Sequence, residues 1–391
     1  FTSDPGRRRG QLVMRRVALS AGLVAAAALG VGWVIARRLT APSTRRYDLT
    51  VRKVEHDGDG CLIVLDRTQQ TTAKGIYNLW FENGGWAQLS ADVLDRGPTL
   101  IARQVTSTAP ELTLRAGDRV SWSGIYYATP RDAGLHAHDI TIDTHAGPAP
   151  AWRIDGDSAN STWAIHIHGL GSLRAGTLRG VLAATERGYT SLVITYRADG
   201  EGPGVGCSRS TLGYAEAEDA AAAIEYAMRH GARRVVLFGW SMGAAIALQL
   251  AHNPSYRRSI AGLVLDSPVL DWTEVIKANC ARSGLPAAAG HLAIPWLTLH
   301  PLARAGGLPG RIPLRSFDWT ARAADLTTPT LILHGTRDDS VPIRLSQALR
   351  EARPDLVELE TFDAGHTLCW NADPDRWHET MTVWLKARVP R

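Results

Sequence analysis

The sequence predicts an α/β protein with a mostly parallel sheet and helices on both faces, preceded by a small β-rich domain and an N-terminal transmembrane helix. Three observations lead to this fold class. Short apolar strands alternate with helical stretches from residue 163 onward, which is typical of strand–helix–strand units. Several strand-like runs crowd into residues 46–150, and residues 17–36 form an unbroken uncharged run. We therefore expect a tail and anchor in residues 1–45, an accessory domain in 46–150 and a main domain in 151–391.

The N-terminal run of residues 17–36 contains 20 uncharged residues. At about 1.5 Å of rise per residue, a helix of this length would span roughly the 30 Å hydrocarbon core of a bilayer. A cleaved signal peptide and a buried soluble helix are the alternatives. The length of the run and the lack of a small-residue cleavage site before Ala41 favour an uncleaved anchor.

The positive charge of the chain is concentrated around this run. Residues 1–53 carry eleven Lys or Arg and two Asp, a net charge of +9, whereas the remainder carries 32 basic and 36 acidic residues, a net charge of −4. Such flanking charge favours anionic lipid headgroups and argues against a nucleic-acid partner. A short Arg-rich tail is costly to translocate, so we predict a single-pass protein of the cell membrane with its tail inside and its main domain outside.

Residues 46–150 are too long for a linker and read as a small β-rich accessory domain. Turn-rich stretches separate the strand-like runs. We expect the domain to end near residues 147–150, where two prolines favour an extended link. The expected strands cover residues 49–54, 61–65, 75–81, 101–106 and 138–143.

Strands and helices alternate through the main domain. No Gly-x-Gly-x-x-Gly motif joins a first strand to its helix, so we expect no dinucleotide cofactor. Residues 268–315 interrupt the alternation with an apolar, proline-containing insertion, which we expect to lie over Ser241 as a cap. The expected strands are 163–168, 191–196, 234–238, 259–266, 330–334 and 356–362, and the expected helices are 173–188, 213–230 and 244–251.

The sequence Gly-Trp-Ser-Met-Gly at residues 239–243 lies between a predicted strand and a predicted helix. A sharp strand-to-helix turn forces its central residue into a strained backbone conformation, and the flanking glycines leave room for that turn. This context predicts a nucleophile elbow with Ser241 exposed at the edge of the sheet.

A serine nucleophile requires a base, a group that orients the base, and donors for an oxyanion. Asp338 follows the strand at 330–334, and its Asp-x-x-Val-Pro context favours it over Asp339; His366 follows the strand at 356–362. The order Ser, Asp, His is the order expected for this type of elbow. We predict a triad of Ser241, Asp338 and His366, which requires no metal or cofactor.

The backbone N–H groups of Leu170 and Met242 are the candidate oxyanion donors. Leu170 lies in a small-residue loop after the strand at 163–168, and Met242 follows the nucleophile. His166 and His168 share one strand face, but no third ligand lies nearby, so we interpret them as structural rather than metal-binding.

With these residues in view, residues 151–391 resemble the α/β-hydrolase superfamily. Three further motifs are similar to a group of membrane-anchored actinobacterial hydrolases: Ile-Thr-Tyr-Arg-Ala-Asp at 194–199, Phe-Asp-Trp-Thr-Ala-Arg at 317–322 and His-Thr-Leu-Cys-Trp-Asn at 366–371. The first motif usually has Asn where this chain has Ala198. The resemblance implies ester or acyl hydrolysis and no particular substrate.

Candidates for the substrate pocket are four tryptophans, Trp240, Trp272, Trp296 and Trp370, which either line an apolar acyl pocket or serve plain packing. Cys207 and Cys280 should lie at the rim of the active site and are candidates for a disulfide bond.

The sequence therefore predicts a membrane-anchored serine hydrolase that cleaves a carboxylic ester, lipidic or otherwise acylated. A serine peptidase or thioesterase shares the triad and is the alternative among enzymes. A hydrolase fold without activity, used for binding, is the alternative from another class, although the intact Ser, Asp and His argue against it. The sequence does not indicate an oligomeric state.

Overall fold

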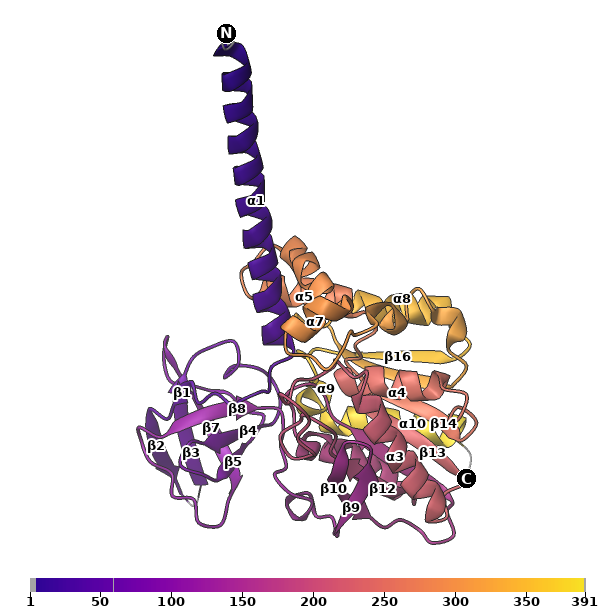
Figure 1. Cartoon of the computed structure of the whole chain (residues 1–391). Coiled ribbons are helices and arrows are strands. Elements are labelled where there is room, and N and C mark those ends of the chain that lie inside the picture. The colour runs from indigo at the N-terminus through magenta and orange to yellow at the C-terminus, as the bar shows by residue number, and fades with distance from the viewer. Residues whose placement is uncertain (1–4, 59, 390–391) are drawn as a thin grey trace.

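The computed structural model describes residues 5–58 and 60–389, apart from the side chains of residues 5–19, 21, 24 and 57. A long helix, α1 (Pro5–Leu39), projects from a body that contains two sheets (Figure 1). The predicted span 17–36 lies within α1, and the side chains of five of its residues are among those not described. Among the described residues, no helix has the length and apolarity of a membrane span.

The first sheet forms the accessory domain and is antiparallel throughout. Its order is β1-β8-β4-β5-β7-β3-β2, with β6 added beside β7. Alternate residues such as Ile63, Leu65 and Leu79 are buried in its core. The predicted β-rich domain is thus confirmed. The strands are β1 (Leu49–Thr50), β2 (Lys53–Asp57), β3 (Gly60–Asp66), β4 (Tyr77–Phe81), β5 (Trp86–Leu89), β6 (Leu94–Asp95), β7 (Leu100–Thr108) and β8 (Arg119–Ser123).

The second sheet belongs to the main domain and has the order β16-β15-β14-β13-β11-β12-β10-β9. Its strands from β11 to β16 are parallel, whereas β10 and β9 add an antiparallel hairpin at one edge. The strands are β9 (His138–Thr144), β10 (Gly147–Ile154), β11 (Thr162–Ile167), β12 (Thr190–Ile194), β13 (Arg234–Trp240), β14 (Ile260–Asp266), β15 (Thr330–Gly335) and β16 (Val357–Phe362).

The boundary between the two domains does not lie at the predicted position near 147–150, because of the hairpin formed by β9 and β10. Ala151 pairs with Ile194 of β12, so β10 is part of the main sheet and the accessory domain ends after β8. The prediction was wrong because a strand pattern reports local conformation and does not show which sheet a strand joins.

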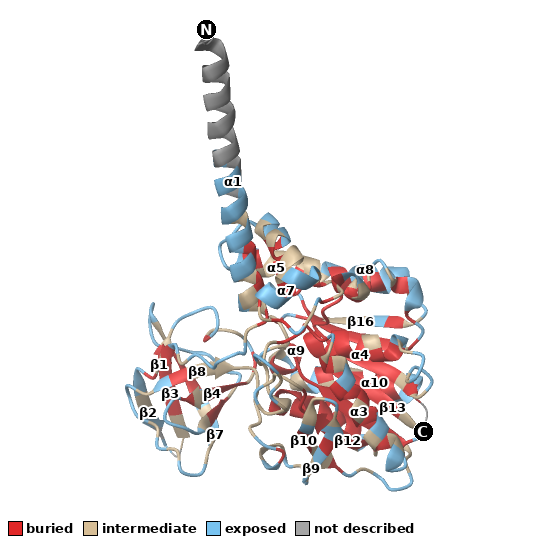
Figure 2. Cartoon of the chain, viewed as in Figure 1, coloured by how far each residue is buried: buried red, intermediate tan, exposed pale blue. Residues whose placement is uncertain are grey.

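Helices cover both faces of the main sheet, as predicted (Figure 2). The central strands are buried along almost their whole length because both faces are covered, which explains their continuous apolar sequences. Helices α3, α4 and α8 pack on one face, and α2 and α10 on the other. The helices are α2 (Leu178–Glu186), α3 (Glu216–Arg229), α4 (Met242–His252), α8 (Arg344–Ala352), α9 (Cys369–Ala372) and α10 (Pro374–Arg388).

The cap contains short helices that pack against the end of α1. Trp296 donates its indole N–H to the carbonyl of Leu29 at 3.0 Å, and Ala36 is buried in the main core. At Gly32 a Cβ would lie 2.0 Å from the carbonyl oxygen of Leu292. The last turns of α1 are therefore part of the folded main domain. The cap helices are α5 (Trp272–Arg282), η3 (Ala287–Ala293), α6 (Ile294–Thr298) and α7 (His300–Ala305).

Candidate active site

Ser241 occupies the turn between β13 and α4, with φ 53° and ψ −112°. This positive φ is a strained conformation for a residue with a side chain. The flanking glycines allow the turn because the chain approaches itself closely there. A Cβ at Gly239 would lie 2.6 Å from the Cα of Ala244, and one at Gly243 would lie 2.1 Å from the carbonyl oxygen of Ile167.

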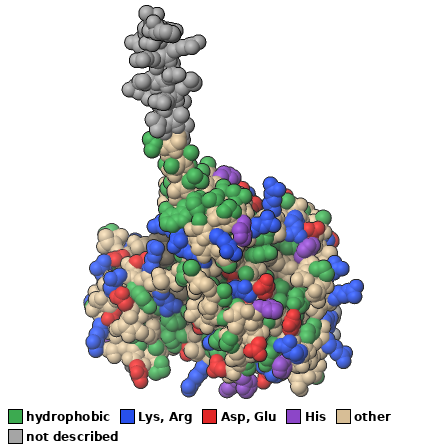
Figure 3. Space-filling view, in the orientation of Figure 1, with side chains coloured by type: hydrophobic (Ala, Val, Ile, Leu, Met, Phe, Trp, Pro, Cys, Tyr) green, Lys and Arg blue, Asp and Glu red, His purple; other side chains and the backbone are tan. Residues whose placement is uncertain are grey.

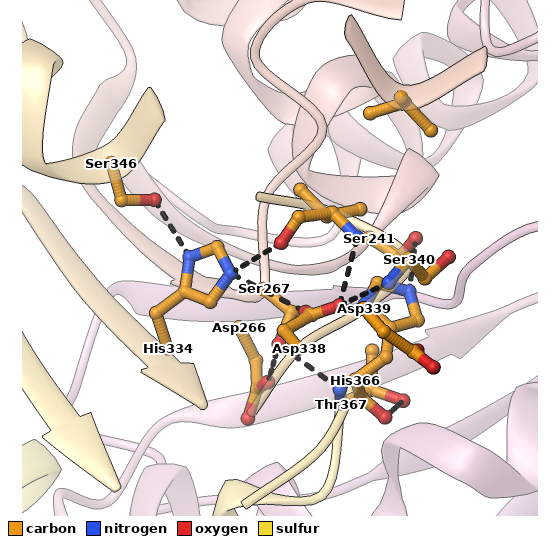
Figure 4. Close-up of polar contacts among 12 residues, drawn as sticks. Ser241, Asp266, Ser267, His334, Asp338, Asp339, Ser340, Ser346, His366 and Thr367 are labelled. Carbon is orange, nitrogen blue, oxygen red and sulfur yellow. Dashed lines mark hydrogen bonds and ion pairs between the residues drawn. The ribbon is translucent and has the colours of Figure 1, made fainter. Parts of the chain in front are cut away.

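The structure brings the three predicted triad side chains together at the carboxyl ends of the parallel strands (Figure 4). The Oγ of Ser241 lies 2.9 Å from Nε2 of His366, and Nδ1 of His366 lies 2.7 Å from Oδ2 of Asp338. Because a carboxylate only accepts hydrogen bonds, Nδ1 carries the proton and Nε2 is free to accept from Ser241. This is the tautomer that a general base requires.

Asp338 is held in place by several donors. Its Oδ1 accepts hydrogen bonds from the backbone N–H groups of Ser340 at 2.9 Å and Val341 at 2.8 Å. Burial opposes ionisation of this carboxyl, but hydrogen bonds from His334 and His366 outweigh that effect and hold its pKa well below the ordinary value. Asp339, in contrast, is exposed and lies 3.7 Å from Arg282.

His334 is a second histidine that contacts the acid and that was not predicted as a site residue. Its Nε2 lies 3.0 Å from the carbonyl of Val341 and 3.3 Å from Oδ2 of Asp338, so Nε2 carries a proton and donates to both. Its Nδ1 lies 2.8 Å from the hydroxyl of Ser346, as Figure 4 shows. His334 is the penultimate residue of β15 and ends the predicted strand at 330–334, four residues before Asp338, which was the available sequence signal.

The two candidate oxyanion donors flank Ser241. Leu170 lines the cavity beside Ser241, and Met242 is the first residue of α4, where an N–H has no acceptor within the helix. No backbone acceptor among the described residues is bonded to either N–H. Leu170 lines the cavity whereas Met242 does not, and the role of both N–H groups as oxyanion donors stays a prediction.

A buried network supports the loop that contains Leu170. His168 donates through Nε2 to Asp199 at 3.0 Å, stacks on Tyr196, and lies 2.9 Å from the hydroxyl of that tyrosine through Nδ1. Tyr196 also contacts the carbonyl of Gly169. His168 thus has the structural role predicted for it. Ala198 adopts a φ of 64° in the intervening turn, a conformation that Asn tolerates better than Ala.

The cavity beside Ser241 has a volume of about 80 Å³. Pockets that enclose drug-sized ligands usually measure about 300–1,000 Å³, so this cavity accepts only a small part of a substrate. Among the described residues, no side chain of the cap lines it. The lining residues are His168, Gly169, Leu170, Ser172, Gly176, Thr177, Arg179, Trp240, Ser241, His366 and Thr367.

Only one of the four tryptophans predicted to line the pocket does so, namely Trp240. Trp272 is buried in the core and donates to the carbonyl of Leu212, while Trp296 packs on α1. Trp370 packs against Tyr126 and Tyr127, with ring centroids 5.5 and 5.7 Å away. For these three residues the alternative, plain packing, is correct, because each aromatic ring fills an interface between elements.

The predicted disulfide bond is absent, since all four cysteines are free thiols. Cys207 is exposed in the loop after β12, whereas Cys280 is buried in α5 among core residues. Two thiols with such different surroundings do not meet. In the described part of the chain, no cluster of three His, Cys, Asp or Glu side chains could hold a metal ion.

The loop that contains His366 is anchored from behind. The N–H of Thr367 donates to Oγ of Ser267 at 3.0 Å, and the guanidinium of Arg179 donates to the carbonyl of Thr367 at 3.0 Å and to Oδ1 of Asn371 at 2.6 Å. Arg179 and Asn371 were not predicted as site residues. Asn371 could have been predicted, because it ends the motif that begins with His366. Nothing in the sequence around Arg179 distinguishes that arginine from the others.

Asn371 also joins this loop to the accessory domain. Its side-chain amide donates to the carbonyls of Ile76 at 2.8 Å and Gly124 at 3.1 Å. Its backbone carbonyl accepts a hydrogen bond from the N–H of Ile76 at 2.9 Å. A Cβ at Gly75 would lie 2.0 Å from the carbonyl oxygen of Asn371. The accessory domain is therefore in direct contact with the segment that carries His366.

Taken together, the strained serine, the correctly protonated histidine and the buried acid can carry out nucleophilic acyl transfer. Comparison with known proteins agrees with this class. Residues 164–380 match a model of the alpha/beta hydrolase family, and the chain belongs to that family. Residues 50–123, which contain nearly all of the accessory sheet, match a family described only as a domain of unknown function.

Individual proteins that resemble this chain share less than 30% sequence identity with it. An uncharacterized protein of Mycobacterium tuberculosis is 29% identical over 217 residues, covering 54% of this chain and 65% of that protein. The Cronobacter sakazakii protein named "Putative carbamate hydrolase RutD" is 26% identical over 254 residues, covering 58% of this chain and 91% of that protein. The esterase Pf2001 of Pyrococcus furiosus shares the fold, with a TM-score of 0.52 and 22% identity over 67% of this chain and 96% of its own. The narrower resemblance to membrane-anchored actinobacterial hydrolases stays a prediction.

Proposed function

We propose that this protein is a serine esterase that cleaves a carboxylic ester through an acyl-Ser241 intermediate. The observation that carries the proposal is the continuous contact from Ser241 through His366 to Asp338, at 2.9 and 2.7 Å. Geometry of this kind is the requirement for an activated serine nucleophile.

In the proposed reaction, His366 accepts the proton of Ser241 at Nε2 while Oγ attacks the ester carbonyl carbon. The N–H groups of Leu170 and Met242 would stabilise the negative oxygen of the tetrahedral intermediate. His366 then returns the proton to the departing alkoxide, which leaves as an alcohol. Water attacks the acyl-enzyme by the same route and releases a carboxylic acid, while Asp338 keeps the imidazole oriented throughout.

The cavity favours a short acyl group over a long one. Its volume of about 80 Å³ is too small for a fatty acyl chain. We therefore propose a small, water-soluble ester as substrate, in place of the lipidic ester that the sequence suggested. The triad alone does not distinguish an esterase from a thioesterase or a peptidase, so the test must compare them.

The proposal is tested with p-nitrophenyl esters of two, four, eight and twelve acyl carbons, a short thioester and a p-nitroanilide. We expect turnover of the two- and four-carbon esters, a steep loss of kcat/KM with longer chains, and no turnover by Ser241→Ala. Faster cleavage of the anilide or thioester than of the matching ester, or a preference for twelve carbons, would contradict the substrate class. Ser316→Ala, at a half-buried residue that does not line the cavity, is the control.

We also propose that α1 attaches the protein to a membrane, with the main domain outside the cell. The sequence of residues 17–36 supports this proposal, as do the exposed side chains of Leu23, Leu29 and Val34. Figure 3 shows apolar side chains gathered where α1 meets the body.

A truncation that tests the attachment must spare the turns of α1 that pack on the cap. Deletion of residues 1–27 keeps Ala36 and the contact of Leu29 with Trp296, which a deletion of residues 1–45 would remove. We expect the full chain to sediment with membranes and the shortened chain to remain in solution at unchanged esterase activity. A full chain that stays in the supernatant would contradict the proposal.

A further inference from the structure

Arg179 places a buried positive charge in the wall of the active-site cavity. The residue lies in the first turn of α2, is 5% exposed, and lines the same cavity as Ser241 and His366. The proposed ester hydrolysis gives no role to a cation at this place. A guanidinium is costly to bury unless a counter-charge or hydrogen bonds compensate it.

The hydrogen bonds of Arg179 account for only part of its donor groups. Nε donates to the carbonyl of Gly176 at 3.0 Å, and Nη1 donates to Thr367 and Asn371. Nη2 has no partner among the described residues and is not one of the fully buried polar atoms, and Arg179 lines the cavity. One nitrogen of the guanidinium is therefore free to donate toward a ligand in the cavity.

The charge of Arg179 also lacks a direct counter-ion in the described part of the chain. Its neutral acceptors are two backbone carbonyls and the amide oxygen of Asn371. The carboxylate of Asp266 acts on it electrostatically, but that carboxylate is bonded to Trp377 at 3.2 Å and Ser267 at 3.1 Å. No acidic side chain among the described residues lines the cavity.

From this geometry we infer that the acyl part of the substrate carries a carboxylate, which Nη2 of Arg179 binds while Ser241 attacks the ester carbonyl. The inference rests on the proposed esterase function and specifies its substrate class, a half-ester of a short dicarboxylic acid. The small cavity accepts only a short acyl group, and a charge-assisted hydrogen bond that is shielded from water is stronger than a neutral one.

Two esters that differ only at the end of the acyl group test this inference. Monomethyl succinate carries a carboxylate where methyl butyrate carries a methyl group, and proton release in a weakly buffered solution reports the cleavage of both. We expect the wild-type protein to prefer monomethyl succinate by about tenfold to a hundredfold in kcat/KM, the range for a hydrogen bond to a charged group. Succinate should likewise inhibit the hydrolysis of p-nitrophenyl butyrate more strongly than butyrate does.

Variants separate ligand binding from the support that Arg179 gives to the His366 loop. In Arg179→Gln, a displaced loop would slow both esters alike, whereas loss of the anion contact lowers the ratio between them toward one. Arg174→Gln is the matched control, because Arg174 lies five residues earlier in the same segment, pairs with Glu201 and does not line the cavity.

The outcomes separate a failure of the proposed carboxylate contact from a failure of the proposed esterase function. Equal kcat/KM for the two esters in the wild type, together with equal inhibition by succinate and butyrate, would overturn the inference and leave Arg179 a purely structural residue. An unchanged ratio in folded Arg179→Gln would do the same. If Arg179→Gln does not fold, the two wild-type measurements still decide. Failure to cleave any ester, p-nitrophenyl butyrate included, would instead refute the proposed function.

Discussion

The two sheets of this protein contribute to the active site in different ways. The main sheet supplies side chains, because Ser241, Asp338 and His366 all follow the carboxyl ends of its strands. The accessory sheet supplies no lining residue among those described, yet residues at the ends of its interior strands β4 and β8 contact Asn371, five positions after His366. One sheet therefore positions reactive groups, and the other holds the segment that carries one of them.

The contact between the accessory domain and Asn371 depends on backbone groups and on one buried arginine. Arg103 is fully buried and donates to the carbonyls of Thr71, Ala73 and Gly75, which fixes the loop that presents Ile76 to Asn371. Burial lowers the pKa of Arg103 below its usual value. A buried arginine surrounded by carbonyls indicates that this loop has a fixed shape, as a docking surface requires.

The largest expected effects concern the side chains of the main sheet. Ser241→Ala and His366→Ala should each lower kcat for p-nitrophenyl acetate by about 10⁴-fold or more, and the double variant should lose no more than either single one. The two residues act as one unit, so their losses do not add. Additive losses, or more than about a tenth of wild-type activity in folded Ser241→Ala, would contradict the triad.

The acid is the next element to test. Asp338→Asn should lower kcat by about 10³- to 10⁴-fold, because the amide donates a hydrogen bond and stabilises the wrong tautomer of His366, as in the known effect of this change in a serine protease triad. Asp339→Asn is the matched control and should change kcat by less than about threefold, since Asp339 is exposed. Reversed effects would show that Asp339 orients the base.

Much of this site was predictable, and the reason is physical. A strand followed by a tight turn leaves a local pattern, so Ser241, Asp338 and His366 could be predicted from the residues around them. Arg179 contacts Thr367, and Asn371 contacts Ile76. In both pairs the two partners are far apart in the sequence, so no local pattern predicts the contact. The position of the hairpin at 138–154 and the packing of Trp272 and Trp296 likewise depend on tertiary contacts that no local pattern encodes.

The contribution of the accessory sheet can be isolated with two glycines. Gly75 and Gly97 both have positive φ, 106° and 96°, but a Cβ at Gly75 would collide with Asn371 while one at Gly97 has open space around it. Gly97→Ala should cost about 1–2 kcal/mol of stability through backbone strain alone. Gly75→Ala should cost more and should also lower kcat. Denaturant unfolding and kcat of both variants provide the comparison, and equal effects would mean that the contact does not support the active site.

The smallest expected effect is the pH dependence contributed by Asp338. Its pKa is lowered in the folded state, so ionised Asp338 stabilises the fold above the unfolded-state value of about 3.9, and this stabilisation is lost as pH falls below that value. The difference in free energy of unfolding between the wild type and Asp338→Asn should therefore be largest near pH 7 and should shrink by pH 3. A difference that is constant with pH would contradict the assigned ionisation.

The most direct test of the triad is covalent labelling with a fluorophosphonate, followed by mass spectrometry of the peptides. The triad of Ser241, His366 and Asp338 predicts a single adduct on Ser241 in the wild type, greatly slowed labelling in His366→Ala and unchanged labelling in Asp339→Asn. Labelling of folded Ser241→Ala at the wild-type rate, or no labelling of the wild type, would contradict the central claim that Ser241 is an activated nucleophile.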